Sequence, residues 1–330
     1  MKNRIAIVLL LAVALLTSLG WTAESWGQAN LPRIGILTSF TITDDPALRQ
    51  WFEPFRRTLA DQGWIDGKNF LFDYRGAQND TSRFAGAAAE LVALKVDVIW
   101  ATSAPMVRAA YAATRTIPIV AQDFTTDPVA EGYVESYRRP GGNVTGVFLD
   151  APEFAGKWFE LLKAMVPDLS RVVVLWDPSP GPTHLRAVQS AAQVFGIKLQ
   201  VLEVHKPEDM DRAFTALRGR PQALIILPSP WIYSHSERLA KLALKYRLPG
   251  TSMARLFAEA GGAVAYGPEL ASASERSAVL VAKILGGAKP AELPVERPTK
   301  VQLVVNLKTA KALGITIPQS ILLRADEVLR

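Results

Sequence analysis

The stretch VDVIWATSAPMVRAAYAATRTIPIVA, residues 96–121, decides the fold class. It contains two short runs rich in β-branched residues, Val96–Trp100 and Ile117–Ala121, which flank the helical stretch Pro105–Thr114. A strand, a helix and a second strand at this spacing are typical of a parallel βαβ unit, in which the helix covers a face of the sheet. The sequence therefore predicts an α/β protein.

The same alternation continues on both sides of this stretch. On the N-terminal side it predicts strands at Arg33–Leu37 and Asn69–Tyr74 and helices at Ala47–Gln62 and Thr81–Leu94. Beyond Asp150 a second series begins, with strands at 171–176, 198–204, 223–227, 248–252 and 263–266 and helices at 153–165, 184–195, 208–217 and 236–246. Two successive doubly wound series predict two Rossmann-like lobes with parallel sheets.

Three more elements follow the second series. They are a helix at Ser272–Leu285, a strand at Lys300–Asn306 and a short helix at Leu307–Leu313. We expect them to complete the first lobe, so that several crossings of the chain join the two lobes. The predicted organisation is a signal peptide at 1–29, the first lobe at 31–146, the second lobe at 147–265, and a return to the first lobe and the hinge at 266–330.

The beginning of the chain has the three regions of a secretory signal peptide. Lys2 and Arg4 precede an apolar run at 5–16, and small or polar residues follow up to a cleavage site at Ala29 or Ala23. The apolar run is shorter than the roughly 20 residues of a membrane-spanning helix, and residues 1–29 contain no twin-arginine pair. We expect a cleaved Sec-type signal and a periplasmic protein; a retained membrane anchor is the alternative.

Cysteine is absent from all 330 residues. Its absence excludes disulfides, thiolate metal sites, cysteine nucleophiles and a lipidated N-terminal cysteine, so a lipoprotein is not expected. A large exported chain without disulfides suits a bacterial periplasm. The 37 basic and 31 acidic residues give a net charge of +6 without blocks of like charge, so a nucleic-acid partner is not expected either.

Sequence motifs of catalysis and cofactor binding are missing. No G-x-G-x-x-G follows a predicted strand, and the chain has no P-loop, no G-x-S-x-G elbow and no H-E-x-x-H pair. The three histidines, His184, His205 and His235, lie in separate elements, where surface or capping roles are expected. We therefore expect no cofactor, no metal and no enzymatic activity.

Polar side chains follow the predicted strands, at the edge where ligands bind in open parallel sheets. They are Ser39, Thr102, Ser103, Asp123, Asp177 and Ser229. These groups can hydrogen-bond a small polar ligand, and the helix N-termini after Ser39 and Ser103 can receive a carboxylate. The alternative for each residue is helix capping. Asp123 and Asp127 lie four residues apart and are interpreted as a cap and a ligand contact, not as an acid and a base.

Two long segments carry a resemblance to a known family. They are Thr114–Gly146, TRTIPIVAQDFTTDPVAEGYVESYRRPGGNVTG, and Gly286–Pro318, GGAKPAELPVERPTKVQLVVNLKTAKALGITIP. Shorter matches lie at 156–157, 160–162, 260–262, 266–268 and 324–327. Over residues 31–330 the chain closely resembles the bacterial ABC-transporter substrate-binding family that includes the tryptophan- and tyrosine-type binding proteins.

The resemblance implies a type I periplasmic-binding-protein fold, in which two lobes joined by three crossovers trap a ligand by hinge closure. Carried over by position, the family's cleft loops lie at Ser39, Thr102-Ser103, Asp123 to Asp127, Asp177, Ser229 and Arg255. Thr102, Ser103 and Asp123 offer hydroxyls for the carboxylate and an acid for the ammonium of an α-amino acid. The loop ATSAPMVRAA lacks the glycine common in relatives, which leaves amino-acid specificity open. Trp231 is a candidate for stacking on a ring, with packing at the lobe edge as the alternative.

The leading hypothesis is a receptor that delivers a small polar or aromatic molecule, such as an amino acid or an aromatic acid, to an ABC importer. Its expected partners are that ligand and the inner-membrane permease with its ATPase, and we expect a monomer. Two alternatives remain. One is a sensor that presents its ligand to a signalling receptor. The other is an exported enzyme, for which Asp123, Asp177 and His235 are the candidate residues.

Overall fold

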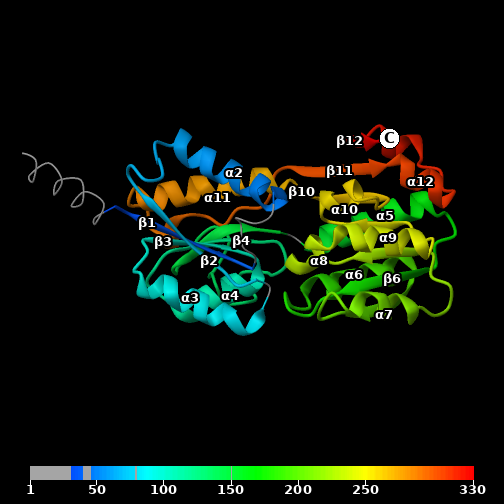
Figure 1. The fold of residues 1–330 in the computed structure, drawn as a ribbon, viewed down its shortest axis with the longest axis horizontal. Helices are drawn as coiled ribbons and strands as arrows, with labels where there is room; N and C mark the ends of the chain where they lie inside the picture. Colours follow the sequence, from blue (N-terminus) through cyan, green and yellow to red (C-terminus); the bar gives the residue numbers. More distant parts are fainter. Residues whose placement is uncertain (1–30, 40–45, 79, 150) are drawn as a thin grey trace, which may run out of the picture.

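The structure, a computed structural model, describes residues 31–39, 46–78, 80–149 and 151–330 of the chain. The predicted signal peptide at 1–29 lies outside the described residues. Two lobes lie side by side (Figure 1), each built around its own sheet. No helix within the described ranges combines the length and the apolar composition needed to cross a membrane.

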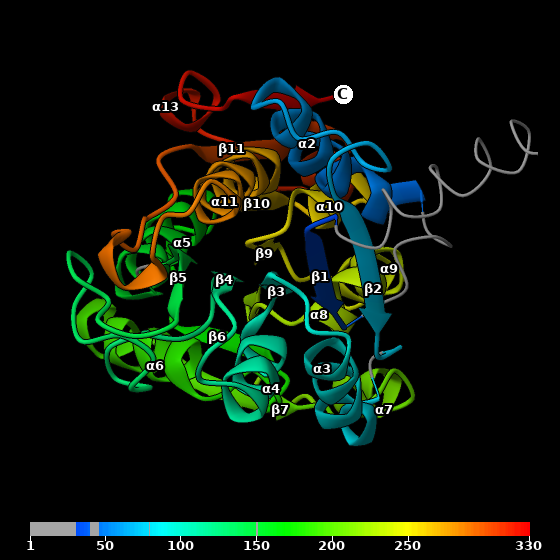
Figure 2. The ribbon, with the colours of Figure 1, turned by 90° about the vertical axis from the view of Figure 1, so that its left-hand side faces the viewer.

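The first lobe contains a five-stranded parallel sheet in the order β2-β1-β3-β4-β5. Its strands are β1 (Arg33–Thr38), β2 (Leu71–Gly76), β3 (Val98–Thr102), β4 (Ile119–Asp123) and β5 (Val144–Phe148). The helices α2 (Pro46–Asp61) and α11 (Leu270–Leu285) cover one face, and α3 (Phe84–Ala93), which follows the 3-10 turn η1 (Thr81–Arg83), and α4 (Ala104–Ala113) cover the other (Figure 2). Since both faces are covered, β3, β4 and β5 are buried along their whole length, whereas the edge strand β2 stays partly exposed.

Aromatic packing fixes one face of this sheet. Trp100 of β3 is fully buried and stacks on Phe55 of α2, with ring centroids 3.7 Å apart. Ile34 of β1 and Val281 of α11 belong to the same buried cluster. Helix α11 is therefore tied to the first strands of the chain through one continuous core.

The second lobe contains a seven-stranded sheet in the order β12-β11-β10-β9-β8-β6-β7. Its strands are β6 (Arg171–Trp176), β7 (Lys198–Glu203), β8 (Ala223–Ile226), β9 (Gly250–Ser252), β10 (Val264–Pro268), β11 (Val301–Asn306) and β12 (Glu327–Leu329). The helices around it are α5 (Ala151–Met165), α6 (Thr183–Phe195), α7 (Asp209–Thr215), α8 (Pro230–Ser234), α9 (Ser236–Lys245), α10 (Arg255–Glu259), α12 (Leu307–Leu313) and α13 (Gln319–Leu322). All pairings in this sheet are parallel except that of β10 with β11. The predicted α/β class with two parallel-sheet lobes is confirmed.

The last elements of the chain correct one expectation. Helix α11 and the segment to Glu296, which pairs with β5, do lie on the first lobe. However, β11 and β12 extend the second sheet, and α12 packs with them, so the expectation that they complete the first lobe is wrong for these elements. The reason is that β10 offers an unpaired edge, which β11 fills in the antiparallel direction. The apolar pattern of a strand does not indicate which of the two sheets the strand will join.

The chain crosses between the lobes three times: from β5 to α5, from β10 to α11, and after Glu296 into β11. The first crossing follows a tightly packed strand. Gly146 of β5 has a φ of +147°, and a Cβ atom built there would lie 2.1 Å from the carbonyl oxygen of Ala121 on β4. Only glycine fits this approach of the two backbones.

Candidate functional site

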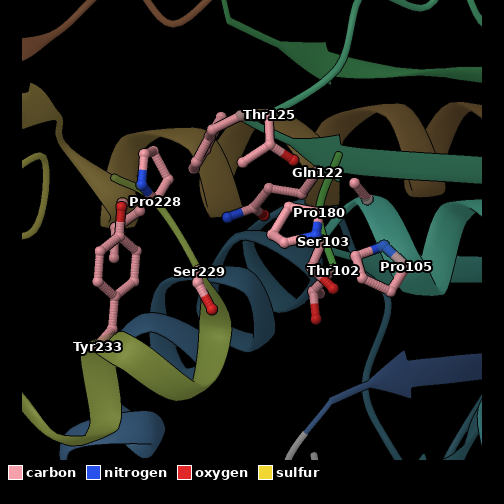
Figure 3. Close-up of a pocket in the computed structure, with 12 residues that line it drawn as sticks. Thr102, Ser103, Pro105, Gln122, Thr125, Pro180, Pro228, Ser229 and Tyr233 are labelled. Carbon is pink, nitrogen blue, oxygen red and sulfur yellow. The ribbon is translucent and has the colours of Figure 1, made fainter. Parts of the chain in front are cut away.

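The carboxyl ends of β1, β3 and β4 in the first lobe face those of β6 and β8 in the second. Two adjoining cavities lie between them. The inner cavity has a volume of about 110 Å³ and is lined from both lobes (Figure 3). Its residues are Thr102, Ser103, Ala104, Pro105, Gln122, Phe124, Thr125, Pro180, Pro228, Ser229, Tyr233 and Leu270. None of these side chains is charged at neutral pH.

The outer cavity is larger, about 350 Å³, and differs in chemistry. It is lined by Ser39, Thr81, Phe84, Pro105, Asp177, Pro178, Ser179, His205 and Trp231. Pro105 lines both cavities, so the two adjoin at the first turn of α4. The outer cavity contributes a carboxylate and two aromatic side chains, whereas the inner one contributes hydroxyls, an amide and apolar groups.

The junction of the two cavities is the start of α4. Ser103, the N-cap residue, has φ 117° and ψ 153°, a conformation otherwise almost confined to glycine. Its hydroxyl makes no capping hydrogen bond and lies 3.2 Å from the hydroxyl of Ser39. Its backbone N–H donates to the carbonyl of Gln122. The strained backbone thus turns a pair of hydroxyls and the positive end of a ten-residue helix toward the cleft.

Asp177 supplies the negative charge of the cleft. Its carboxylate is 3% exposed and lines the outer cavity. Its Oδ2 accepts hydrogen bonds from the hydroxyls of Ser179 and Ser229, both at 2.6 Å, and its Oδ1 accepts one from the Ser179 N–H at 2.9 Å. A carboxylate has about four acceptor positions. One position on Oδ1 therefore remains for a donor in the cavity.

Tyr233 forms a wall of the inner cavity and carries an unused polar group. It lies one helical turn after Ser229 and donates its N–H to the Ser229 carbonyl. Its hydroxyl is buried, is directed toward Pro228 (Figure 3), and has no hydrogen-bond partner among the described residues. Burial raises the pKa of this phenol far above its usual value, so it is a neutral donor.

A histidine holds the two lobes together beside the inner cavity. His184 of α6 is buried, and its Nε2 hydrogen-bonds the carbonyl oxygen of Phe124, which comes from the loop after β4 in the other lobe. The phenyl ring of Phe124 packs on the core of the second lobe. Burial lowers the pKa of His184 to about 4, so the imidazole is neutral and its Nε2–H donates the bond.

Comparison with known proteins agrees with this architecture. The model of the ABC transporter substrate binding protein family matches residues 36–329. The chain belongs to this family. A curated relative, the tyrosine-binding protein of Clostridioides difficile (strain R20291), is 27% identical over 278 residues, which cover 83% of this chain and 79% of the relative.

Two solved structures resemble this family member over most of its length. The ABC domain in complex with L-Trp from Streptococcus pneumonia is 25% identical, has a TM-score of 0.83, and covers 91% of this chain and 100% of its own. A ligand-free, open substrate binding protein from Clostridium difficile is 26% identical and covers 91% of this chain and 99% of its own, but its TM-score is 0.66. Periplasmic binding proteins of lower identity match as well, and the fold is of type I.

Most of the residues predicted for the site of this binding protein meet in the cleft. Thr102, Ser103 and Ser229 line the inner cavity, and Ser39, Asp177 and Trp231 line the outer one. Trp231 also packs in the buried core of the second lobe, as the packing alternative predicts, and its stacking on a ligand ring stays a prediction.

The structure places three predicted site residues elsewhere. Asp123 is fully buried, and its carboxylate is used within its own loop by the N–H and hydroxyl of Thr125 and by the hydroxyl of Thr126. Burial raises its pKa, against the opposing hydrogen bonds. Exposed Asp127 accepts the N–H groups of Val129 and Ala130. These two carboxylates shape the loop and line neither cavity.

Arg255 is the third residue that lies outside the cleft. Its guanidinium pairs with Glu259 one turn further along α10, at 2.6 Å, and with Glu327 of β12, at 2.7 Å. It lines neither cavity. The sequence predicted Arg255 as a cleft residue because it follows a strand. In the structure the short helix α10 begins at this residue, and the side chain points toward β12.

Several lining residues were not predicted, and three had a signal in the sequence. Tyr233 follows Ser229 by four residues, the spacing that puts two side chains on one helix face. Thr81 and Phe84 follow β2, whose carboxyl end meets the same cleft. His184 differs from its expected surface or capping role because it lies between the lobes, which the sequence does not indicate. No group of three or more His, Asp or Glu side chains placed to bind a metal occurs in the described ranges.

Proposed function

We propose that this chain is an exported receptor that captures an aromatic α-amino acid between its lobes and delivers it to an ABC importer. The observation that carries the proposal is the division of the cleft. An uncharged cavity walled by Phe124 and Tyr233 adjoins a cavity that contains the Asp177 carboxylate. Such a pair suits a ligand with an apolar ring at one end and a charged head at the other.

The groups at the junction orient the ligand. Its carboxylate meets the hydroxyls of Ser39 and Ser103 and the positive end of α4. Its ammonium meets Oδ1 of Asp177, which has an acceptor position left. Its ring lies between the aromatic walls of the inner cavity, where the buried Tyr233 hydroxyl can bond an N–H or O–H on the ring.

Closure of the lobes on the ligand is part of the proposal. The arrangement of the two lobes resembles that of the L-Trp complex, with a TM-score of 0.83, more than that of the open relative, with 0.66. The contact of His184 with Phe124 joins the lobes in this arrangement. A hinge at the three crossings would break this contact and open both cavities.

The family and the N-terminal segment support a proposal on export and partners. We infer that the signal at 1–29 is cleaved and that the mature chain works in the periplasm, docking as a monomer on an inner-membrane permease with its ATPase. Membership of a substrate-binding family of ABC transporters supports this assignment.

Calorimetric titration of protein stripped of ligand by unfolding and refolding tests the proposal. We expect L-tryptophan, L-tyrosine or L-phenylalanine to bind. Two matched analogues, indole-3-propionate without the ammonium and tryptamine without the carboxylate, should bind at least about tenfold more weakly than L-tryptophan because each leaves one charged group unmatched.

Two results would contradict the proposal. In the first, none of the aromatic amino acids binds. In the second, the analogues bind as tightly as the amino acid, which would mean that the cleft does not read the charged head.

A further inference from the structure

A third cavity lies at the far edge of the second sheet, away from the cleft. Arg171 and Lys198 begin β6 and β7, so they stand at the amino ends of strands whose carboxyl ends face the ligand. With Arg218 they line a groove of about 320 Å³, together with Val172, Leu199, Gln200, Gly219 and Pro221. The groove has three cationic side chains and no carboxylate in its lining.

The placement of these cations is electrostatically unfavourable in the protein alone. Arg171 and Lys198 are register partners in the parallel pair of β6 and β7, and like charges directly opposite each other destabilise a sheet. None of the three forms an ion pair with any described residue, whereas Arg33, Arg212 and Arg276 elsewhere each pair with a carboxylate. An anion in the groove would remove this repulsion.

The groove is built from ordered backbone. The side-chain carbonyl of Gln200 accepts the N–H of Arg218, and its amide donates to the carbonyl of Ala216. Gln222 accepts the N–H groups of Ser170 and Arg171 and donates to the carbonyl of Asp168. The side-chain amides of Gln200 and Gln222 thus hold in place the segments that carry Arg218 and Arg171.

The loop that carries Arg218 makes a turn with left-handed backbone directly after that residue. Gly219 and Arg220 both have positive φ, +66° and +49°. This turn directs the carbonyl of Arg220 to the Nε of Arg171, at 3.2 Å. The remaining guanidinium N–H groups of Arg171 are left to face a ligand.

We propose that this groove binds a phosphoryl group. Two guanidinium groups and an ammonium around one groove match the charge and the several acceptor oxygens of phosphate, which arginine binds in bidentate fashion. A free phosphate ester and the headgroup of an anionic lipid share this chemistry. The site is independent of the ligand cleft, at the opposite end of the same strands.

The full chain is tested with two probes. Inorganic phosphate is titrated against chloride at matched ionic strength and followed by amide NMR shifts of residues 171, 198 and 218. Vesicles of phosphatidylglycerol or phosphatidylcholine are tested by flotation. The variant is the double substitution Arg171→Gln and Arg218→Gln. The control, Lys308→Gln and Lys311→Gln, removes the same charge from exposed residues of α12 in the same lobe.

Phosphate binding that weakens about tenfold or more in the groove variant and stays unchanged in the control supports a site for a free phosphoryl ligand. Binding to phosphatidylglycerol vesicles alone, with the same dependence on the variant, supports a lipid headgroup. The proposal is overturned if neither probe binds beyond chloride or phosphatidylcholine, or if both double variants weaken binding equally. A melting transition at the wild-type temperature shows that the groove variant is folded.

Discussion

The inner and outer cavities share Pro105 and yet differ in what they can recognise. The inner cavity has walls of proline, phenylalanine and tyrosine with no charged side chain, and the outer cavity contains Asp177. The difference lies mostly in the second lobe, because the hydroxyls of the first lobe reach both cavities through Ser39 and Ser103. The proposed function therefore assigns the ring of the ligand to the inner cavity and its charged head to the outer one.

The largest effect is expected from the charge of the outer cavity. Asp177→Asn keeps the size of the side chain, and its single carbonyl oxygen can still accept both serine hydroxyls. It loses the bond from the Ser179 N–H and leaves the ligand ammonium without its counter-charge. We expect the Kd for L-tryptophan to rise about 100-fold, while indole-3-propionate binds as before. Calorimetry on both ligands measures this difference.

Asp127→Asn is the matched control, because Asp127 is an exposed carboxylate that, among the described residues, bonds only backbone N–H groups of its own turn. An equal loss of affinity for both ligands in Asp177→Asn, or a loss of the same size in the control, would refute the role of Asp177.

The contact between the lobes beside the inner cavity should be sensitive to acid. The folded pKa of His184 is lowered to about 4 from 6.5 by burial, so the unfolded chain binds the proton more readily. The stabilising effect is complete above pH 6.5 and is lost as the pH falls toward 4. We expect His184 to reduce the free energy of unfolding by about 2 kcal/mol between pH 7 and pH 4.5.

Urea unfolding of the wild type and of His184→Gln at both pH values isolates this contribution. Glutamine can donate to the Phe124 carbonyl but does not titrate, so its stability should fall less on acidification. Identical losses in the two proteins would show that His184 is not buried in its neutral form.

The junction stores backbone strain that can be released. Ser103→Gly removes the side chain from a conformation that favours glycine, and we expect the ligand-free protein to gain about 1 kcal/mol or more of stability. Ligand affinity should fall severalfold, since the hydroxyl is lost. Ser103→Ala, which loses the hydroxyl and keeps the strain, should show the lower affinity without the added stability. If both variants melt at the same temperature, the backbone conformation of residue 103 does not destabilise the protein.

The smallest effect is expected from the ring end of the inner cavity. Tyr233→Phe removes a buried hydroxyl that has no partner among the described residues, so the ligand-free melting temperature should stay equal or rise slightly. The affinity for L-tryptophan or L-tyrosine should fall about fivefold, whereas that for L-phenylalanine, which has no polar ring group, should not change. A uniform loss for all three ligands would assign Tyr233 a packing role only.

The fold was largely predictable because parallel strands covered on both faces leave an unmistakable pattern, as in Val96–Trp100 and Arg171–Trp176. The cleft residues that follow such strands directly, among them Ser39, Ser103 and Asp177, were predictable for the same reason. Asp123 also follows a strand, but whether a carboxylate turns into the cleft or into its own loop depends on neighbours such as Thr125 and Thr126.

Long-range pairing set the other limit on prediction. The strand Val301–Asn306 is apolar enough for either sheet, and only the free edge of β10 decides its place. The contact of His184 with Phe124 joins residues 60 positions apart in different lobes, so no local pattern could indicate it.

Closure of the two lobes over an aromatic amino acid is the central claim, and a distance between the lobes tests it most directly. The chain has no cysteine, so spin labels can be placed at Leu94→Cys in the first lobe and Val194→Cys in the second, both at exposed positions. We predict that saturating L-tryptophan converts a longer or broader distribution of distances into one short, narrow distance. The same distribution with and without L-tryptophan would contradict it.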